Sequence, residues 1–247
     1  MPNDYNTYHF TTKENVITVL QGMFVISILG ILFYRSILGI LILAPLVYFY
    51  RKRKSKFLRK DRDWKLNLEF KDGIVALSAA LEAGYSAENA FEEAHRDLGR
   101  IYEEDAIILK EFSYIIHQIR MNITVEKALG DFGARTGIED IVSFSEVFNT
   151  AKRTGGDLIH VIKITSNIIS DKIEVKREIV TLITAKRLEA NIMKVIPLVI
   201  LIYLSFSSPG FLNPLYHSLF GIIIMTIFLI CYLGAFLLID KIVAIEV

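Results

Sequence analysis

The chain has 247 residues, of which 53% are hydrophobic and 22% are charged, and its formal net charge is +1. This composition excludes an ordinary soluble domain unless the apolar residues are concentrated in segments that can cross a membrane. They are concentrated, because residues 16–50 carry one charge, Arg35, and residues 195–239 carry none. The single cysteine, Cys231, excludes an intramolecular disulfide and cysteine-based zinc sites of the usual spacing.

The first apolar block, residues 16–50, predicts a transmembrane hairpin preceded by a cytoplasmic segment, residues 1–15. A helix needs roughly 20 apolar residues to cross the hydrocarbon core, so we expect spans at about 16–34 and 37–50. A cleaved signal peptide is the alternative. We disfavour it, because the apolar run is longer than the roughly 7–15 residues expected and no small-residue cleavage site follows.

A basic collar, defined here as residues 51–65, follows the hairpin. It contains nine Lys or Arg against two Asp, whereas residues 66–191 contain 21 Asp or Glu against 15 Lys or Arg. Because Lys and Arg accumulate on the cytoplasmic side of membranes, we expect residues 51–191 and both termini to be cytoplasmic. Positive charge confined to a collar suits a membrane surface and argues against nucleic acid as a partner.

The middle of the chain is predicted to be a bundle of about six helices. Residues 62–191 contain no proline, and proline costs about 3 kcal/mol inside a helix. Apolar residues from Leu66 to Leu81 recur at helical spacing on one face. We expect the helices at about 62–83, 86–98, 103–120, 124–135, 138–153 and 157–191, the last running on into the third membrane span.

Turn and cap residues separate these predicted helices. Gly84 and Asn122 are of the types that most easily adopt positive φ, and each is followed two positions later by a Ser or Thr that can cap the next helix. A third turn has an Asp as its cap. The residues assigned to turns and caps are Gly84, Ser86, Asn122, Thr124, Gly155, Gly156 and Asp157.

The second apolar block, residues 192–239, predicts another transmembrane hairpin. We expect spans at about 192–207 and 219–239, joined by a loop rich in Pro and Gly and followed by a cytoplasmic tail, residues 240–247. Lys194 is near enough to the cytoplasmic end to extend its ammonium to the membrane surface. The spans hold no interior acidic residue of the kind that marks an ion pathway.

No catalytic motif is present. The sequence has no Walker phosphate loop, no Gly-x-Ser-x-Gly elbow and no His-Glu-x-x-His pair. We therefore predict a protein that is not an enzyme, without catalytic residues, cofactor or metal. The remaining candidate site is an acidic concentration, which is either a solvated face or a docking surface for a basic partner: Glu92, Glu93, Glu103, Glu104 and Asp105.

Several segments in a fixed order resemble a known family. They are the helix–Gly–x–Ser step at residues 81–90, the segment 151–158, the charged helix that leads to Pro197, and the segment 208–212. Across about residues 66–247 the chain resembles the type II secretion system F domain, and within it the TadB/TadC branch, the inner-membrane platform proteins of Tad (Flp) pili. The resemblance implies a six-helix cytoplasmic bundle between transmembrane hairpins, in a multi-pass protein of the cell (inner) membrane.

The resemblance also implies a role and partners. Such platforms couple a separate cytoplasmic secretion ATPase to the extraction of pilin subunits from the membrane. Related platforms usually carry two F domains and this chain has one, so pairing with itself or with a sister platform protein is expected. A small polytopic transporter or a membrane signalling protein is the alternative.

Overall fold

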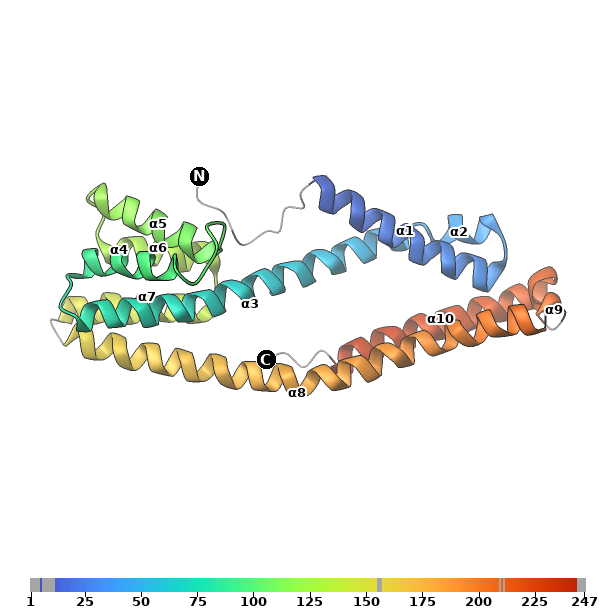
Figure 1. Ribbon diagram of the computed structural model, residues 1–247. Coiled ribbons are helices and arrows are strands. Elements are labelled where there is room, and N and C mark those ends of the chain that lie inside the picture. Colours follow the sequence, from blue (N-terminus) through green and yellow to red (C-terminus); the bar gives the residue numbers. More distant parts are fainter. Residues whose placement is uncertain (1–4, 6–11, 155–156, 209, 211, 244–247) are drawn as a thin grey trace. The chain divides into compact units, whose positions relative to one another are not determined.

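The computed structural model describes Tyr5 and residues 12–154, 157–208, 210 and 212–243, and these residues form helices and connecting turns without any strand (Figure 1). The chain divides into two compact units. The bundle unit comprises Met1–His9 and Lys56–Val175, and the membrane unit comprises Phe10–Ser55 and Lys176–Val247.

Ten helices follow one another in the described part of the chain. They are α1 (Thr12–Tyr34), α2 (Ile37–Leu43), α3 (Leu46–Glu82), α4 (Ala87–Leu98), α5 (Ile107–Arg120), α6 (Val125–Thr136), α7 (Glu139–Thr154), α8 (Leu158–Ser207), α9 (Asn213–His217) and α10 (Leu219–Val243). Three of them, α1, α8 and α10, are long and apolar enough to cross a membrane. The prediction of an all-α membrane protein is confirmed.

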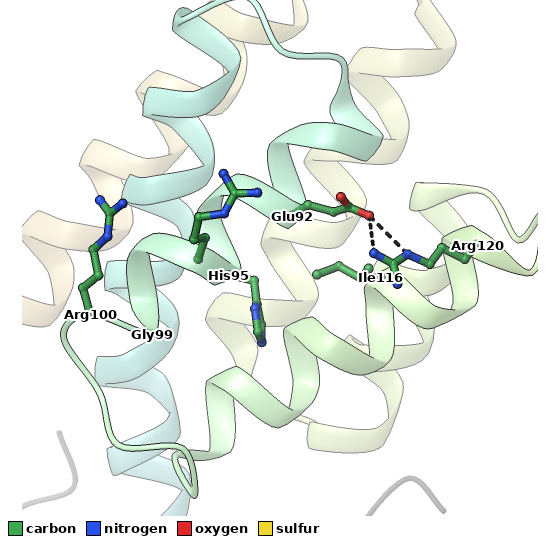
Figure 2. A pocket seen from close by; sticks show the side chains of 7 residues that line it. Glu92, His95, Gly99, Arg100, Ile116 and Arg120 are labelled. Atoms are coloured by element: carbon green, nitrogen blue, oxygen red, sulfur yellow. Dashed lines mark hydrogen bonds and ion pairs between the residues drawn. The ribbon is translucent and has the colours of Figure 1, made fainter.

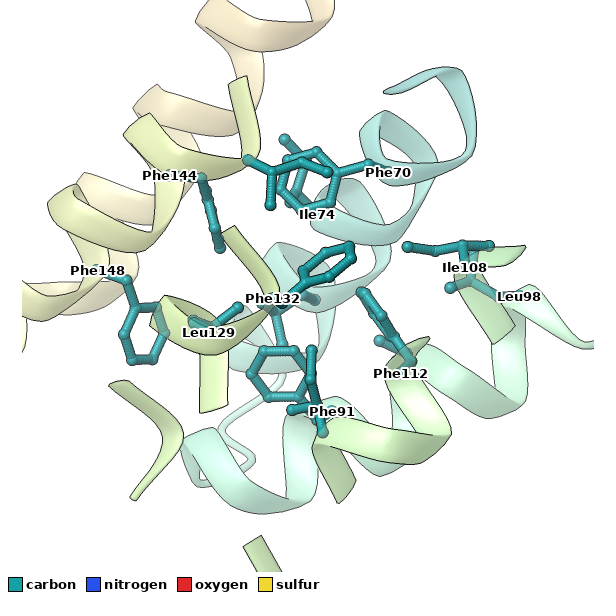
Figure 3. Packing of buried hydrophobic residues seen from close by; sticks show 14 of the residues in the cluster. Phe70, Ile74, Phe91, Leu98, Ile108, Phe112, Leu129, Phe132, Phe144 and Phe148 are labelled. Carbon is teal, nitrogen blue, oxygen red and sulfur yellow. The ribbon is translucent and has the colours of Figure 1, made fainter. Parts of the chain in front are cut away.

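A cluster of six phenylalanines forms the centre of the bundle unit (Figure 3). Two ring pairs pack edge to face, with centroids 5.6 Å apart for Phe70 and Phe144 and 5.4 Å apart for Phe91 and Phe112. Gly73 of α3 lets α5 approach closely, because a Cβ there would lie 2.8 Å from Phe112 Cζ. The packing of helices is therefore set by large rings facing a small residue.

The bundle unit holds all or part of α3 to α8. Most of these helices begin and end within a few residues of the sequence-based expectation, but α5 starts at Ile107 and not at 103, because residues 103–105 form a turn. Helix α3 begins at Leu46, so the basic collar is itself helical. Helix α8 continues without a break from Leu158 to Ser207, which confirms that the last bundle helix runs on into the third apolar segment.

Two segments of the membrane unit differ from the sequence-based expectation. Residues 37–50 are not one helix, because α2 ends at Leu43 and α3 starts at Leu46. Pro45 lies between them, and it lacks the N–H that a continuous helix would need. The expected loop at 208–217 contains the short helix α9, which has a proline in its first turn, where proline is well tolerated.

Candidate functional site

The acidic residues expected to form a docking surface lie on α4 and on the turn before α5. Two of them are neutralised by arginines. Glu92 Oε1 lies 2.9 Å from an Arg120 nitrogen, and Glu93 Oε2 lies 2.7 Å from an Arg96 nitrogen, and the first pair is drawn in Figure 2. The structure therefore separates these two glutamates from the other three acidic residues.

The other three residues, Glu103, Glu104 and Asp105, form what we call the acidic turn. All three are exposed, and none of their carboxylates has an ion pair or hydrogen bond within the described residues. Three consecutive negative charges are thus presented to solvent between α4 and α5. A charged surface of this kind attracts a basic partner over about 10 Å at ordinary ionic strength.

Buried contacts on both sides hold the acidic turn in place. Before it, the Tyr102 hydroxyl donates to Asp72 Oδ2 at 2.5 Å. After it, the Ile108 N–H donates to Glu69 Oε2 at 3.0 Å, which satisfies one of the open N–H groups at the start of α5. Burial, followed by the hydrogen bond to Asp72, raises the pKa of the Tyr102 phenol, so this hydroxyl remains a donor.

A shallow hollow of about 490 Å³ lies between α4 and α5 (Figure 2). Its lining contains three arginines and one glutamate and consists of Glu92, His95, Arg96, Gly99, Arg100, Ile116 and Arg120. The face formed by α4 and α5 therefore carries a hollow lined by three ion-paired arginines beside the acidic turn. Charges of both signs on one rigid face can orient a protein partner. Within the described residues, no group of three His, Cys, Asp or Glu could hold a metal ion.

The predicted turns have distinct backbone geometry. Gly84 has a φ of 93° and Asn122 a φ of 63°, both in the left-handed region that side chains disfavour. Sequence reasoning missed two further positions, Gly137 with a φ of 62° and Arg35 with a φ of 47°. Gly137 ends α6 as its C-cap, and this glycine just beyond a helical pattern was a detectable signal.

The predicted caps differ among themselves. Ser86 Oγ accepts from the N–H three residues later at 3.3 Å, and Asp157 Oδ1 does the same at 3.0 Å. Thr124 occupies the N-cap position of α6 but makes no capping bond with its side chain. Gly155 and Gly156 lie outside the described residues.

Sequence reasoning also missed a buried ion pair in the bundle unit. Arg135 of α6 makes two hydrogen bonds to the Glu111 carboxylate, at 3.0 and 2.6 Å, and a third to Asp131 at 2.8 Å. The two paired side chains are 13% and 6% exposed. Burial alone would lower the pKa of Arg135, but the bonds and charges of Glu111 and Asp131 raise it, so the guanidinium stays charged.

Tyr5 is the one described residue that precedes α1, and it lies against this buried ion pair. Its ring is 4% exposed, and its hydroxyl donates to Glu111 Oε1 at 2.6 Å. Burial first, then the bond to Glu111, raises the pKa of the phenol. A contact between residues 106 positions apart has no local signal in the sequence.

A cluster of charges joins three helices within the membrane unit. The Asp240 carboxylate of α10 pairs with Lys194 of α8 and with Arg53 of α3. The Lys194 ammonium also lies 4.8 Å from the centroid of the Phe236 ring, where a cation is attracted to the ring face. Lys194 therefore has a specific partner, whereas the sequence suggested only an extension of its ammonium to the membrane surface.

The opposite ends of the same apolar helices are also in contact. The Tyr216 hydroxyl, from the segment between α8 and α10, donates to the Leu32 carbonyl of α1 at 2.7 Å. The Arg35 guanidinium, at the turn after α1, lies 5.9 Å from the centroid of the Tyr216 ring. Two sets of contacts thus tie the membrane unit together, one at each end of its helices.

These features define an all-α membrane protein that carries a polar helical bundle. Residues 74–206 match the family described as Type II secretion system (T2SS), protein F. The match extends over more than half of the 247 residues, so the chain belongs to this family. Comparisons with curated proteins and with solved structures find no match.

Membership gives the general role, which is that of a membrane platform protein of type II secretion or type IV pilus-like machinery. The matched residues include the α4–α5 face and Lys194. Tyr5, Arg53 and Asp240 lie outside them.

Proposed function

We propose that the protein is an inner-membrane platform of the TadB/TadC type, on which a cytoplasmic secretion ATPase acts to extract pilin subunits for a Tad (Flp) pilus. The observation that carries this proposal is the family match across the bundle unit and α8. The platform acts by binding and transmitting motion and does not itself catalyse a reaction. It works as an oligomer with itself or with a sister platform protein.

The contacts of Tyr5 support two membrane crossings before the bundle unit. Tyr5 touches Glu111, so both lie on the same side of the membrane. Helix α1, between them in the sequence, has 23 residues and is apolar enough to cross. The chain then has to return, and α2 with the apolar start of α3 supplies the length for it, since 14 residues from 37 to 50 precede the collar.

The charge cluster supports four crossings in total. Arg53 follows the second apolar segment, Lys194 lies near the start of the third and Asp240 follows the fourth, and Asp240 pairs with both cations. Their pairing favours one membrane face for all three. The contacts of Tyr216 with Leu32 and Arg35 favour the opposite face for the two connecting turns. Because the basic collar begins at the first face, the bundle unit and both termini are cytoplasmic.

The acidic turn is the proposed ATPase contact. Reversing its three charges with Glu103→Lys, Glu104→Lys and Asp105→Lys should reduce capture of the cognate secretion ATPase by the purified platform at least tenfold, since like charges then meet a basic partner. Glu146→Lys, Asp171→Lys and Glu178→Lys form the matched control, because these acids are also exposed and without ion pairs in the described residues. Equal capture by both triple variants and the native chain would remove the acidic turn from the proposal.

The role itself is tested in cells. Deleting the protein should leave pilin subunits in the membrane fraction and abolish assembled pili, and the native chain supplied in trans should restore them. If pilin assembly survived deletion while a solute flux was lost, the transporter alternative would replace the platform.

A further inference from the structure

The environment of Tyr5 has the properties of a binding site, and three helices of the bundle unit contribute to it. Glu111 and Tyr114 come from α5, Arg135 from α6 and Arg62 from α3. The Arg62 guanidinium lies 5.0 Å from the centroid of the Tyr5 ring, and Arg135 lies 5.1 Å from the centroid of Tyr114. Two cations and one buried carboxylate thus surround the phenol.

Each polar group of Tyr5 has a partner of the matching kind. The hydroxyl donates to Glu111 Oε1 at 2.6 Å, the backbone carbonyl accepts from Arg62 at 2.6 Å, and the backbone N–H donates to the Arg135 carbonyl at 3.3 Å. The bundle unit therefore contacts both the side chain and the main chain of Tyr5, as a protein surface does when it recognises an extended peptide.

The site discriminates tyrosine from phenylalanine. Glu111 is 5% exposed and accepts from Tyr5 and from Arg135 on the same oxygen. A phenylalanine would fill the same space and leave this buried carboxylate with fewer donors. Polar sites reject ligands that lack the matching hydroxyl far more strongly than apolar sites do, because their own groups are then left unpaired.

We propose that α3, α5 and α6 of the bundle unit form a tyrosine-specific peptide-binding site, whose occupant is the chain's own N-terminal segment at Tyr5. Binding attaches the beginning of the chain to the bundle unit. This inference goes beyond the proposed function and does not depend on it.

Hydrogen exchange of the N-terminal peptide in the purified full-length protein tests the site. Tyr5→Phe should accelerate exchange of this peptide about tenfold, and Tyr5→Ala should accelerate it about a hundredfold or more, because the first removes one bond to a charged acceptor and the second removes the whole side chain. Tyr102→Phe is the matched control. It removes an equivalent phenol–carboxylate bond, to Asp72, from the same unit, and it should leave exchange at the N-terminus unchanged.

Two results would overturn the proposal. One is native exchange rates in both Tyr5 variants, which would mean that the segment is not held by this side chain. The other is an equal acceleration in Tyr102→Phe, which would mean that general loosening of the bundle unit is being measured. Neither result depends on pilus assembly, so a failure here is separate from a failure of the proposed function.

Discussion

Replacing Gly84 with alanine isolates the cost of a left-handed turn between α3 and α4. Gly84 has a φ of 93°, and a Cβ built there meets no atom within 4 Å. The substitution therefore introduces backbone strain without a clash. Left-handed conformation costs a residue with a side chain about 1–2 kcal/mol, and the reduced freedom of the unfolded chain returns about 0.4–1 kcal/mol. The expected net loss is about 1 kcal/mol.

Gly130 is the matched control for this substitution. It lies inside α6, and a Cβ there also meets nothing within 4 Å. Because glycine weakens a helix interior by about 0.5–1 kcal/mol relative to alanine, Gly130→Ala should stabilise the protein. The same added methyl group is thus expected to act with opposite sign at the two positions.

Thermal unfolding of the full-length protein in detergent, followed by circular dichroism, measures both effects. A change of 1 kcal/mol shifts the Tm of a domain of 150–250 residues by about 2–4 °C. We expect Gly84→Ala to unfold below the native protein and Gly130→Ala above it. If both variants shifted in the same direction, the reasoning from the φ of Gly84 would be refuted.

Two further predictions concern charged groups of the bundle unit. Arg135→Met should destabilise the protein by about 3–5 kcal/mol because Glu111 then remains buried without its cation. The double variant Glu111→Gln with Arg135→Met should recover part of that loss. A double variant as unstable as the single variant would contradict this account. Glu126→Gln tests a dependence on pH. Burial alone would raise the pKa of Glu126, but its hydrogen bonds to backbone N–H and to Lys152 lower it. The contribution of the Glu126 carboxylate to the stability of the protein is therefore present above the unfolded pKa of about 4.5. It is lost as the pH falls through the lower folded pKa. In urea titrations, Glu126→Gln should therefore be less stable than the native protein at pH 7 and equally stable at a pH below the folded pKa of Glu126. The same difference in the free energy of unfolding at both pH values would contradict the lowered pKa.

Local sequence patterns were sufficient to predict most helices of the bundle unit. Helical spacing of apolar residues and the absence of proline predict segments close to α4, α6 and α7, because these signals act within a few residues. The same local reasoning missed the break at Pro45, since the apolar run on either side continues unchanged. It also set the start of α5 too early, because the acidic turn contains residues that are acceptable in a helix.

The sequence alone could not predict which charged residues that are far apart in the chain form ion pairs. Glu92 and Glu93 were grouped with the acidic turn because they are near it in sequence, yet the cation that neutralises Glu92 is Arg120, 28 residues away on α5. Asp240 and Lys194 are 46 residues apart, and their pairing depends on how α8 and α10 pack. A single sequence gives the charges of a surface but not which of them face each other.

The charge cluster of the membrane unit has a consequence for how the protein is made. Arg53 is synthesised first, Lys194 much later, and Asp240 only after nearly all of α10. Until α10 is in place, the two cations lack the carboxylate that pairs with both of them, and an unpaired charge beside apolar helices is costly. Helix α10 therefore supplies the carboxylate with which Arg53 of α3 and Lys194 of α8 pair, so both cations lose this partner in a chain that lacks α10.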